Sequence, residues 1–449
     1  MSVDLSAYFD QFLENISLGE PQVSRMNRAA STISDFLEER YGIPSDNVFI
    51  QGSYANNTAI EPVNGGEYDI DIVALCVGGG VTCNDALDQL ANHFLNDGRY
   101  SARVKRKKPC IRLEYADDDV GSFHVDVVPT RVSEVNTAPL EAPRRDEGWR
   151  ATNPSEYTSW CLRQGSLYTR TVMAMKRWRD EQQSVRNAVK SIVLQVLVAQ
   201  CLPQTSDDAA RMTETFAALH AHLQNQQQAP VVSNPVLPSE NLAQNWSRES
   251  FRSFVKELSE AVEISRAANR ATDLVEAADA WRELLGDDFP ILSPAQLGLE
   301  LLDYSHAESP EEKGWSLDVD DRYRVSISAT VQRGRSGKGR KILEENGRIV
   351  FHGNKIHFRA HVTAPNHVEV WWQVANTGGH AKSVGGLRGQ IFKGRNLDNK
   401  SIAQDENWED TSYTGTHLIR ALLVRERKVV ATGGWFRVNI YAKGHPFRR

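Results

Sequence analysis

The pattern of apolar and polar positions divides the chain into stretches of different character. Residues 5–41 place apolar side chains at helical spacing, and strand-like segments with loops follow up to about residue 152. From residue 153 onward apolar residues recur every three or four positions, which predicts a bundle of helices. Beyond residue 316 short segments alternate apolar and polar side chains between turn residues, which predicts a β-sandwich or barrel. We therefore expect an α/β core with an N-terminal helix over residues 1–152, a helical lobe over 153–304, a charged linker over 305–315 and an all-β C-terminal domain over 316–449.

Turn-forming residues refine the boundaries of the expected elements. The first helical region should end at Gly42-Ile43-Pro44, and the helix Asn84–Leu95 has Asn84 as its candidate N-cap. The Gln- and Pro-rich segment 224–238 is predicted to be a loop. Further helices are expected over residues 167–181, 188–201, 209–223, 251–267 and 271–285. Strands of the β domain are expected over residues 323–327, 349–351, 356–362, 368–374 and 435–441.

A pair of acids stands on one predicted strand of the first domain. Asp69 and Asp71 alternate with Ile70 and Ile72, so the carboxylates share one face of the strand and the isoleucines share the other. Two carboxylates held this close repel each other, and Mg²⁺ relieves the repulsion because it prefers oxygen ligands and bridges to substrate phosphates. Taken alone, such a pair is also typical of a solvated strand face, so its meaning depends on the surrounding motifs.

Two neighbouring motifs favour the catalytic interpretation. Gln51-Gly52-Ser53 follows an apolar strand, and there the glycine lets backbone N–H groups approach a phosphate while the serine adds a hydroxyl donor. Downstream, Phe123, Val125 and Val127 fall on one face of a strand and Asp126 falls on the other. A buried carboxylate without a partner is costly. In this order the acids predict a nucleotidyltransferase site, with Asp126 as a further metal ligand or as the general base of a two-metal displacement.

The same motif order resembles the polymerase-β-like nucleotidyltransferases. More narrowly it resembles the bacterial cGAS/DncV-like group, the CD-NTases of anti-phage signalling operons. The narrower resemblance is carried by Thr152–Tyr157, Met175–Trp178, Lys190–Leu194 and Asn234–Leu242. This chain has Asn234 where an acid is common in the family. The resemblance covers roughly the first two-thirds of the chain and implies a polymerase-β-like α/β core with a helical lobe.

The resemblance also implies particular ligands and contacts. Mg²⁺, with Mn²⁺ as the alternative, would bind at Asp69, Asp71 and Asp126, and ATP or GTP would be the substrate. Nucleotide contacts would come from Gln51, Gly52, Ser53, Lys176, Lys190, Ser191 and Asn241. From the residues alone, Lys176 also fits an ordinary solvated helix face. The pair Lys190-Ser191 also fits an ordinary helix N-cap, which uses the same backbone N–H groups as a phosphate site.

The C-terminal third carries a second resemblance. Trp371–Gly378, followed by Gly386–Gly389, resembles the AGS-C sensor domain that is often fused to such nucleotidyltransferases. That resemblance implies ligand sensing, whereas the residues themselves equally fit core tryptophans and a rigid surface for a partner. The basic stretch Arg333–Lys341 lacks the spacing of a P-loop and fits either a nucleotide or nucleic-acid contact or a flexible loop. The basic run Arg103–Lys108 either steers nucleotides or protects a strand edge.

The composition argues against several classes of protein. Of the 449 residues 40% are hydrophobic and 24% are charged, with a net charge of −6. This mild acidity argues against a protein that coats nucleic acid. The five cysteines form no C-x-x-C pair and predict reduced thiols. The sequence has no apolar run long enough to span a bilayer, and its first residues do not resemble a signal peptide, so we expect a cytoplasmic protein.

Together these observations predict an enzyme that joins nucleoside triphosphates into a cyclic or linear oligonucleotide second messenger and releases pyrophosphate. Its role would lie in anti-phage defence, with a trigger ligand or protein acting at the C-terminal domain and a separate effector protein reading the product. One alternative is a nucleotidyltransferase that modifies RNA or protein, such as a tRNA nucleotidyltransferase or an AMP-adding toxin. The other alternative is a non-catalytic protein that only senses nucleotides.

Overall fold

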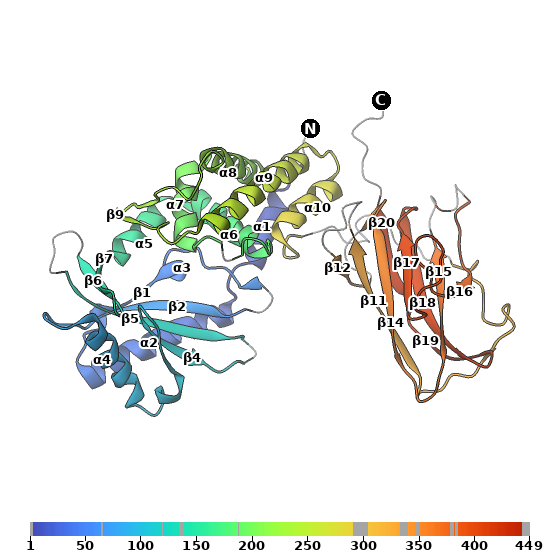
Figure 1. Cartoon of the computed structure of the whole chain (residues 1–449), viewed down its shortest axis with the longest axis horizontal. Coiled ribbons are helices and arrows are strands. Elements are labelled where there is room, and N and C mark those ends of the chain that lie inside the picture. The colour runs from blue at the N-terminus through green and yellow to red at the C-terminus, as the bar shows by residue number, and fades with distance from the viewer. Residues whose placement is uncertain are drawn as a thin grey trace. The chain divides into compact units, whose positions relative to one another are not determined.

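A computed structural model describes residues 3–63, 66–118, 120–133, 139–186, 188–290, 304–332, 340–345, 350–377, 381 and 385–441. The chain forms two compact units, Met1–Pro290 and Ile291–Arg449 (Figure 1). The first combines a mixed sheet with helices, and the second is built from strands. The predicted fold class, an α/β core with a helical lobe followed by an all-β domain, is therefore confirmed.

The core of the first unit is a sheet whose strands run in the order β1-β2-β5-β4-β3. Its strands are β1 (Val48–Gln51), β2 (Tyr68–Leu75), β3 (Val104–Arg106), β4 (Ile111–Tyr115) and β5 (Phe123–Val132), with β6 (Leu140–Arg144) and β7 (Gly148–Thr152) continuing from β5. β2 and β5 are parallel, whereas β1 and β4 pair antiparallel to them. The middle of the basic run 103–108 thus forms the edge strand β3, where lysines commonly discourage pairing with other chains.

Two helices cover one face of this sheet (Figure 1). α2 (Glu20–Tyr41) and α4 (Cys83–Leu95) pack their apolar sides in one hydrophobic cluster with Ile70, Ile72 and Val125. As expected, α2 ends at Gly42, which adopts the left-handed conformation that favours glycine. The prediction that Asn84 is the N-cap was wrong. The helix starts at Cys83, one residue before the predicted start, and the Thr82 hydroxyl caps it by accepting a hydrogen bond from the N–H of Asp85.

The helical lobe packs around its own hydrophobic core. Its helices are α5 (Pro154–Arg163), α6 (Ser166–Glu181), α7 (Ser191–Cys201), α8 (Asp208–Leu223), α9 (Arg248–Arg270) and α10 (Leu274–Leu285), and α1 (Ser6–Asn15) joins them although it precedes the sheet in sequence. Trp178 and Trp281 are fully buried there, and Phe9 of α1 packs edge-on against Trp281. The helices expected from residue 167 to 285 are confirmed, each with small differences at its ends.

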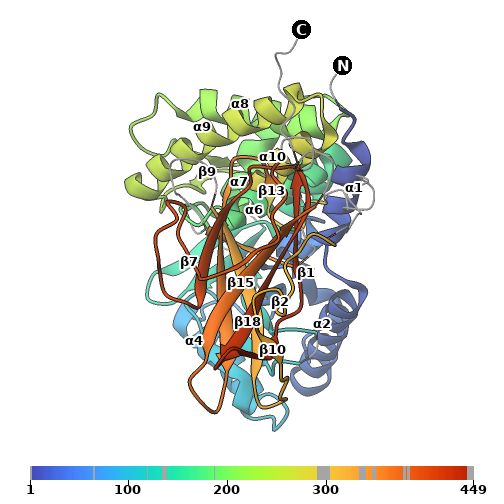
Figure 2. The same cartoon turned by 90° about the vertical axis from the view of Figure 1, so that its right-hand side faces the viewer.

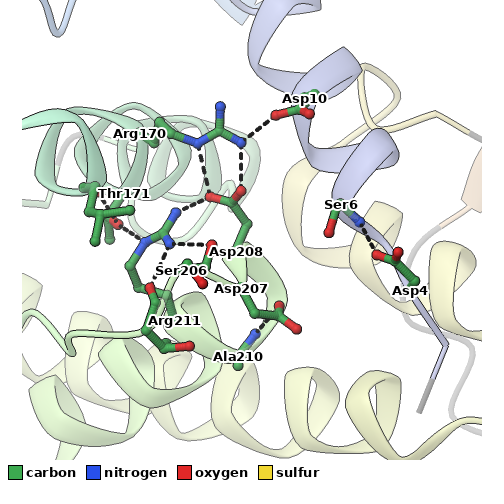
Figure 3. Close-up of polar contacts among 12 residues, drawn as sticks. Asp4, Ser6, Asp10, Arg170, Thr171, Ser206, Asp207, Asp208, Ala210 and Arg211 are labelled. Carbon is green, nitrogen blue, oxygen red and sulfur yellow. Dashed lines mark hydrogen bonds and ion pairs between the residues drawn. The ribbon is translucent and has the colours of Figure 1, made fainter. Parts of the chain in front are cut away.

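A partly buried ionic network holds α1, α6 and α8 together (Figure 3). The Asp208 carboxylate accepts hydrogen bonds from Arg170 and from the fully buried Arg211. Arg170 also donates to Asp10 of α1, and Arg211 donates to the Thr171 hydroxyl. Because every charge in this network has a partner, it fixes three helices that are distant in sequence.

The predicted loop over residues 224–238 is only partly a loop. Its last residues enter a hairpin of β8 (Ser233–Asn234) and β9 (Leu237–Asn241). The prediction was wrong there because this short ladder rests on backbone pairing and on two buried side chains, Asn234 and Leu237, rather than on alternation of apolar residues.

The second unit is a sandwich of two sheets around one core. The larger sheet contains β10 (Ser316–Leu317), β13 (Val350–Phe351), β15 (Glu369–Asn376), β16 (Ile391–Phe392), β18 (Gly415–Arg425), β19 (Lys428–Thr432) and β20 (Phe436–Tyr441). The smaller one contains β11 (Arg324–Gln332), β12 (Arg340–Leu343), β14 (Lys355–Thr363) and β17 (Glu406–Asp410). Figure 2 shows the long strands β15 and β18 side by side, and they pair antiparallel over their length.

Two features of the second unit bear on the sequence predictions. Trp372 is fully buried and Trp371 is partly buried, so both tryptophans of the AGS-C-like motif pack within the sandwich unit. Residues 333–339 of the basic Gly-rich stretch lie outside the described residues.

Among the described helices none combines the length and the apolar character that a membrane span requires.

Candidate active site

The paired acids of β2 lie on the face of the sheet opposite α2 and α4. Ile70 and Ile72 are each 1% exposed and point into the hydrophobic cluster, so the period of two turns Asp69 and Asp71 to the other face. The antiparallel pairing of β1 places Gln51 opposite Asp71. The predicted alternation of the two acids with the two isoleucines is therefore confirmed.

Asp126 comes from the neighbouring parallel strand. In the register of β2 and β5, Asp71 lies directly opposite Asp126. On the other side of β5, Arg112 of β4 lies opposite Asp126 and donates two hydrogen bonds to its carboxylate, at 2.8 and 2.9 Å. The Asp126 side chain is 13% exposed, so this bidentate pair is shielded from solvent. Arg112 thus compensates one of the three negative charges.

Electrostatic repulsion is concentrated on Asp71. Burial, together with the charges of Asp69 and Asp126, raises the pKa of the Asp71 carboxyl to about 7, although Arg112 opposes this shift. A carboxyl of this kind is stabilised whenever a cation arrives.

Gly52 lets the backbone approach this carboxyl. Its φ is +78°, a value that favours glycine, and a Cβ at this position would overlap the Asp71 carboxylate. The residue therefore has both a conformational and a steric reason to be glycine. Ser53 follows it in the short helix α3 (Gly52–Ala55) and lines the same cleft.

The carboxylate oxygens are the kind of ligand that Mg²⁺ prefers. His124, on the same face as Asp126, lies 3.9 Å from Asp69 and 3.8 Å from Asp126, and its Nδ1 is 2.8 Å from Glu67. Among the described residues no group of three Asp, Glu, His or Cys side chains converges closely enough to hold an ion by itself. A metal here would take part of its coordination from water and substrate phosphates, which is the usual arrangement for Mg²⁺.

A cleft of about 600 Å³ opens in front of these acids, between the sheet and the helical lobe. This volume lies within the range of small-molecule sites. Its lining comes from both parts of the first unit: Gln51, Gly52, Ser53, Asn56, Glu67, Asp69, Asp71, Asn153, Tyr157, Lys176, Arg179, Asp180, Ser191, Gln195, Asn234 and Glu240 are among the residues that form it.

Lys176 of α6 is a buried cation in this cleft. Its ammonium group donates a hydrogen bond of 2.8 Å to the carbonyl oxygen of Thr58. Burial lowers the pKa of Lys176 to about 8, and the nearby Arg179 acts in the same direction. The interpretation of Lys176 as a solvated helix residue is therefore wrong, because the helix face that carries it is turned into the protein.

The predicted contacts on α7 separate into one residue that lines the cleft and one that does not. Ser191 begins α7, and its hydroxyl accepts a hydrogen bond of 3.1 Å from Arg179. Lys190 is the N-cap residue and is exposed, and it does not occur among the described residues that line the cleft. Arg179 was not identified from the sequence, although it stands in the same helix, one turn after Lys176.

The hairpin of β8 and β9 contributes different residues from the one predicted. The Asn241 side chain accepts hydrogen bonds from the N–H groups of Val232 and Ala243, which stabilises the hairpin, and among the described lining residues Asn241 does not occur. Instead Asn234 and Glu240 line the cleft, with the Asn234 amide donating to the Glu240 carboxylate at 2.7 Å. An acid thus faces this region from Glu240, although position 234 is an asparagine.

Comparison with known proteins identifies two families along the chain. Residues 1–164 match the model of the Second Messenger Oligonucleotide or Dinucleotide Synthetase domain, SMODS. Residues 305–441 match the model of the Adenylyl/Guanylyl and SMODS C-terminal sensor domain, AGS-C. The first match includes the strands that carry Asp69, Asp71 and Asp126.

Individual relatives agree with the first match. A cyclic AMP-AMP-AMP synthase of an Acinetobacter species is 27% identical over 301 residues, which cover 62% of this chain and 84% of that protein. A c-di-GMP synthase of Roseivirga ehrenbergii is 24% identical over 317 residues, covering 61% of this chain and 82% of that protein. Among solved structures, the CD-NTase CdnG of Bradyrhizobium diazoefficiens in complex with GTP superposes with a TM-score of 0.53 at 19% identity, over 63% of this chain and 96% of that one. This structure supports the fold of the first unit.

Proposed function

The chain is a nucleotidyltransferase of the CD-NTase type, with a SMODS domain and an AGS-C sensor domain, and we propose that it uses Mg²⁺ to join nucleoside triphosphates into an oligonucleotide second messenger. Relatives of this family make cyclic oligonucleotides. The product of this chain, cyclic or linear, would be read by a separate effector protein in anti-phage defence.

The observation that carries the proposal is the pairing of Asp71 with Asp126 on parallel strands, directly beneath Gly52. Folding alone gives no reason to place two carboxylates side by side, because their repulsion costs stability. Of the three acids, Asp69 and Asp71 line a cleft that is also lined by the cations Lys176 and Arg179, while Asp126 does not occur among its described lining residues. Negative and positive groups in one cleft fit a ligand that combines a divalent cation with a triphosphate.

The residues divide the chemical work between them. Asp69 and Asp71 would hold the metal, which supplies charge stabilisation at the α-phosphate and the leaving pyrophosphate when it is bound. Asp126 would orient and deprotonate the attacking hydroxyl, and its pair with Arg112 fixes its position. A hydroxyl oxygen then forms the new bond to the α-phosphorus while the bond to pyrophosphate breaks.

The triphosphate would be held from the two walls of the cleft. On the sheet side Gln51, Gly52 and Ser53 present backbone and hydroxyl groups. On the lobe side Lys176 and Ser191 would contact phosphate oxygens, with Arg179 holding the Ser191 hydroxyl in place. Lys190 and Asn241 would act at the edge of the site, Lys190 through long-range attraction of the triphosphate and Asn241 through the hairpin that carries Glu240.

The experiment is to incubate the purified protein with Mg²⁺ and all four ribonucleotides, and separately with the deoxynucleotides, and to identify products by mass spectrometry. The control variants are Asp69→Asn with Asp71→Asn, which should abolish product, and Asp35→Asn on the exposed side of α2, which should not. Product that forms only after RNA or a protein acceptor is added would overturn the proposal in favour of a modifying nucleotidyltransferase. Nucleotide binding without any product would identify the chain as a sensor.

A further inference from the structure

Arg420 occupies an unusual position in the second unit. It lies in the middle of β18, a central strand of the larger sheet, and Leu418 and Leu422 on either side of it along the same face are 2% and 0% exposed. β18 pairs antiparallel with β15, β19 and β20, so one of its faces could be solvated, yet the face that carries Arg420 also holds the buried Leu418 and Leu422. An arginine at its centre therefore needs a physical explanation.

The neighbours of Arg420 are neutral. Its Nε donates a hydrogen bond of 2.8 Å to the side-chain oxygen of Gln373, and its guanidinium lies 4.3 Å above the ring of Trp435. Among the described residues no carboxylate lies within ion-pair distance of Arg420. The two terminal nitrogens of the guanidinium are thus left for another acceptor.

This arrangement costs stability in the absence of a ligand. Burial lowers the pKa of Arg420, because the charged guanidinium is partly removed from water, and only the nearby Tyr304 opposes this effect. A partly buried charge without a counter-charge is unfavourable, whereas a leucine would pack naturally between Leu418 and Leu422. Groups held at such a cost are frequent at binding sites.

A groove of about 620 Å³ lies directly in front of Arg420. The aromatic rings of Tyr304 and Trp435, whose centroids are 5.6 Å apart, form one part of it, and Ser305 and Ser309 are also in its lining. Its acid, Glu308, is already occupied, since it accepts a hydrogen bond from the N–H of Ile391 and lies 3.7 Å from Lys313. The groove therefore presents a positive charge, aromatic faces and hydroxyls.

We propose that this groove is a binding site for a nucleoside phosphate, with the Arg420 guanidinium holding the phosphate and Tyr304 contacting the base. A guanidinium binds phosphate through two parallel hydrogen bonds, and an aromatic ring stacks on any base. The groove is large enough for a mononucleotide, because ligand sites typically measure about 300–1,000 Å³. The ligand is either a free nucleotide or the oligonucleotide that the enzyme itself makes, since both carry this chemistry.

The position of the groove suggests how its occupancy would be transmitted. One wall is the segment Tyr304–Pro310, which is the first described part of the second unit. The Gln373 amide ties this segment to the sheet by donating to the carbonyl of Glu308 at 2.7 Å, and the same glutamine accepts from Arg420. A phosphate on Arg420 would therefore fasten the segment to β15 and β18. This regulatory role rests on the proposed function, whereas binding to the groove does not.

Hydrogen–deuterium exchange of the full chain tests the site, because it resolves the groove from the catalytic cleft. The probes are AMP, adenosine, inorganic phosphate and cyclic di-AMP, each at the same millimolar concentration and without Mg²⁺. At a concentration of about twice the dissociation constant, exchange through local opening should slow about threefold. We expect this slowing over Tyr304–Pro310 and β18 with AMP or cyclic di-AMP. The stronger of the two identifies the source of the ligand.

Two variants sharpen the test. Arg420→Gln removes the charge but keeps an amide that can donate to Gln373, and it should lose the slowing while melting at or above the wild-type temperature. Arg425→Gln makes the same change in charge on the same strand, where the residue bonds to Tyr323 outside the groove, and it should keep the slowing.

Four results would each overturn the proposed site. Adenosine or inorganic phosphate could slow exchange as much as AMP does. Exchange in Arg420→Gln could still be slowed as in the wild type, or neither AMP nor cyclic di-AMP could slow exchange at all. Since the measurement needs no turnover, it stays readable even if the chain makes no product.

Discussion

Replacing Asp71 by asparagine should stabilise the protein, by an amount that grows as the pH rises from about 4 to about 7 and then levels off. The substitution keeps the size of the side chain and removes the charge that burial and the neighbouring acids Asp69 and Asp126 disfavour. An asparagine resembles the protonated carboxyl, which is the form that the folded, metal-free protein prefers up to about pH 7. The pH dependence of the stability gain therefore distinguishes a carboxylate that is destabilised without a bound cation from an ordinary polar residue.

The magnitude follows from the pKa of Asp71. Below about pH 4 the carboxyl is protonated in the folded and the unfolded chain alike, and it contributes no difference in stability. As the pH rises from about 4 through about 7, the unfolded chain releases its proton first, so the wild-type protein loses stability. Above about pH 7 the full penalty applies, and the change from 3.8 to about 7 corresponds to about 4 kcal/mol. Between about pH 5 and pH 8.5 the advantage of the variant should grow by about 3 kcal/mol.

Thermal unfolding in EDTA, followed by calorimetry at both pH values, measures this difference. For a unit of nearly 300 residues each kcal/mol corresponds to about 2 °C, so the gap between variant and wild type should widen by roughly 5 °C. Asp35→Asn, an exposed acid on α2, is the matched control and should show no such widening. Added Mg²⁺ with ATP should raise the midpoint of the wild type and leave that of Asp71→Asn nearly unchanged.

One result would refute the reasoning. If the gap between Asp71→Asn and the wild type stays the same at both pH values, the carboxyl is not destabilised in the folded state. The pairing of Asp71 with Asp126 would then be an ordinary feature of a solvated sheet face, and the main physical support for the metal site would be lost.

Other substitutions have equally definite outcomes. Gly52→Ala should lower both the melting temperature and the rate of product formation, because the left-handed backbone alone costs about 1 kcal/mol and the new Cβ displaces the Asp71 carboxylate; normal activity would contradict this. Asp208→Ala should lower the unfolding free energy by about 3–5 kcal/mol, since it leaves the buried Arg211 without its counter-charge; a loss in urea titrations below about 1 kcal/mol would contradict the role of the network. Lys176→Met should weaken ATP binding about tenfold or more in calorimetric titrations without lowering stability, because it removes a charge whose burial is unfavourable; unchanged affinity would place the triphosphate elsewhere.

The parts of the fold that the sequence predicted well are those with a clear period. The alternation in Tyr68–Leu75 and the three- and four-residue spacing in Ser166–Glu181 are local signals, and the structure follows both. β18 was not predicted, because Gly415–Arg425 is buried along almost its whole length and such a run has no alternation. The packing of α1 in the helical lobe was equally hidden, since it depends on contacts with residues far along the chain.

In the candidate site, too, the residues with a local sequence signal were predicted and those placed by distant contacts were not. The acids were found because three carboxylates on strands that are otherwise apolar are unusual in any fold. Arg179 was missed because a helix period does not reveal which charged side chains face inward, and here the lobe encloses both Arg179 and Lys176. Asn241 was expected to contact nucleotide, but only the three-dimensional hairpin shows that its side chain holds backbone N–H groups while Glu240 reaches the cleft.

The place of α1 has a consequence for synthesis of the protein on the ribosome. Asn15 donates a hydrogen bond to the backbone of Asp288, 273 residues later, and Phe9 and Phe12 pack against Phe289. At about 5–20 residues per second, the ribosome needs roughly 15–55 s to reach the later partner after α1 has been made. During that interval the aromatic face of α1 lacks its native partners Trp281 and Phe289, which makes the early nascent chain a substrate for chaperones. Proteolysis of stalled nascent chains should therefore cut within α1 until Phe289 has left the exit tunnel, and earlier protection would mean that α1 docks elsewhere first.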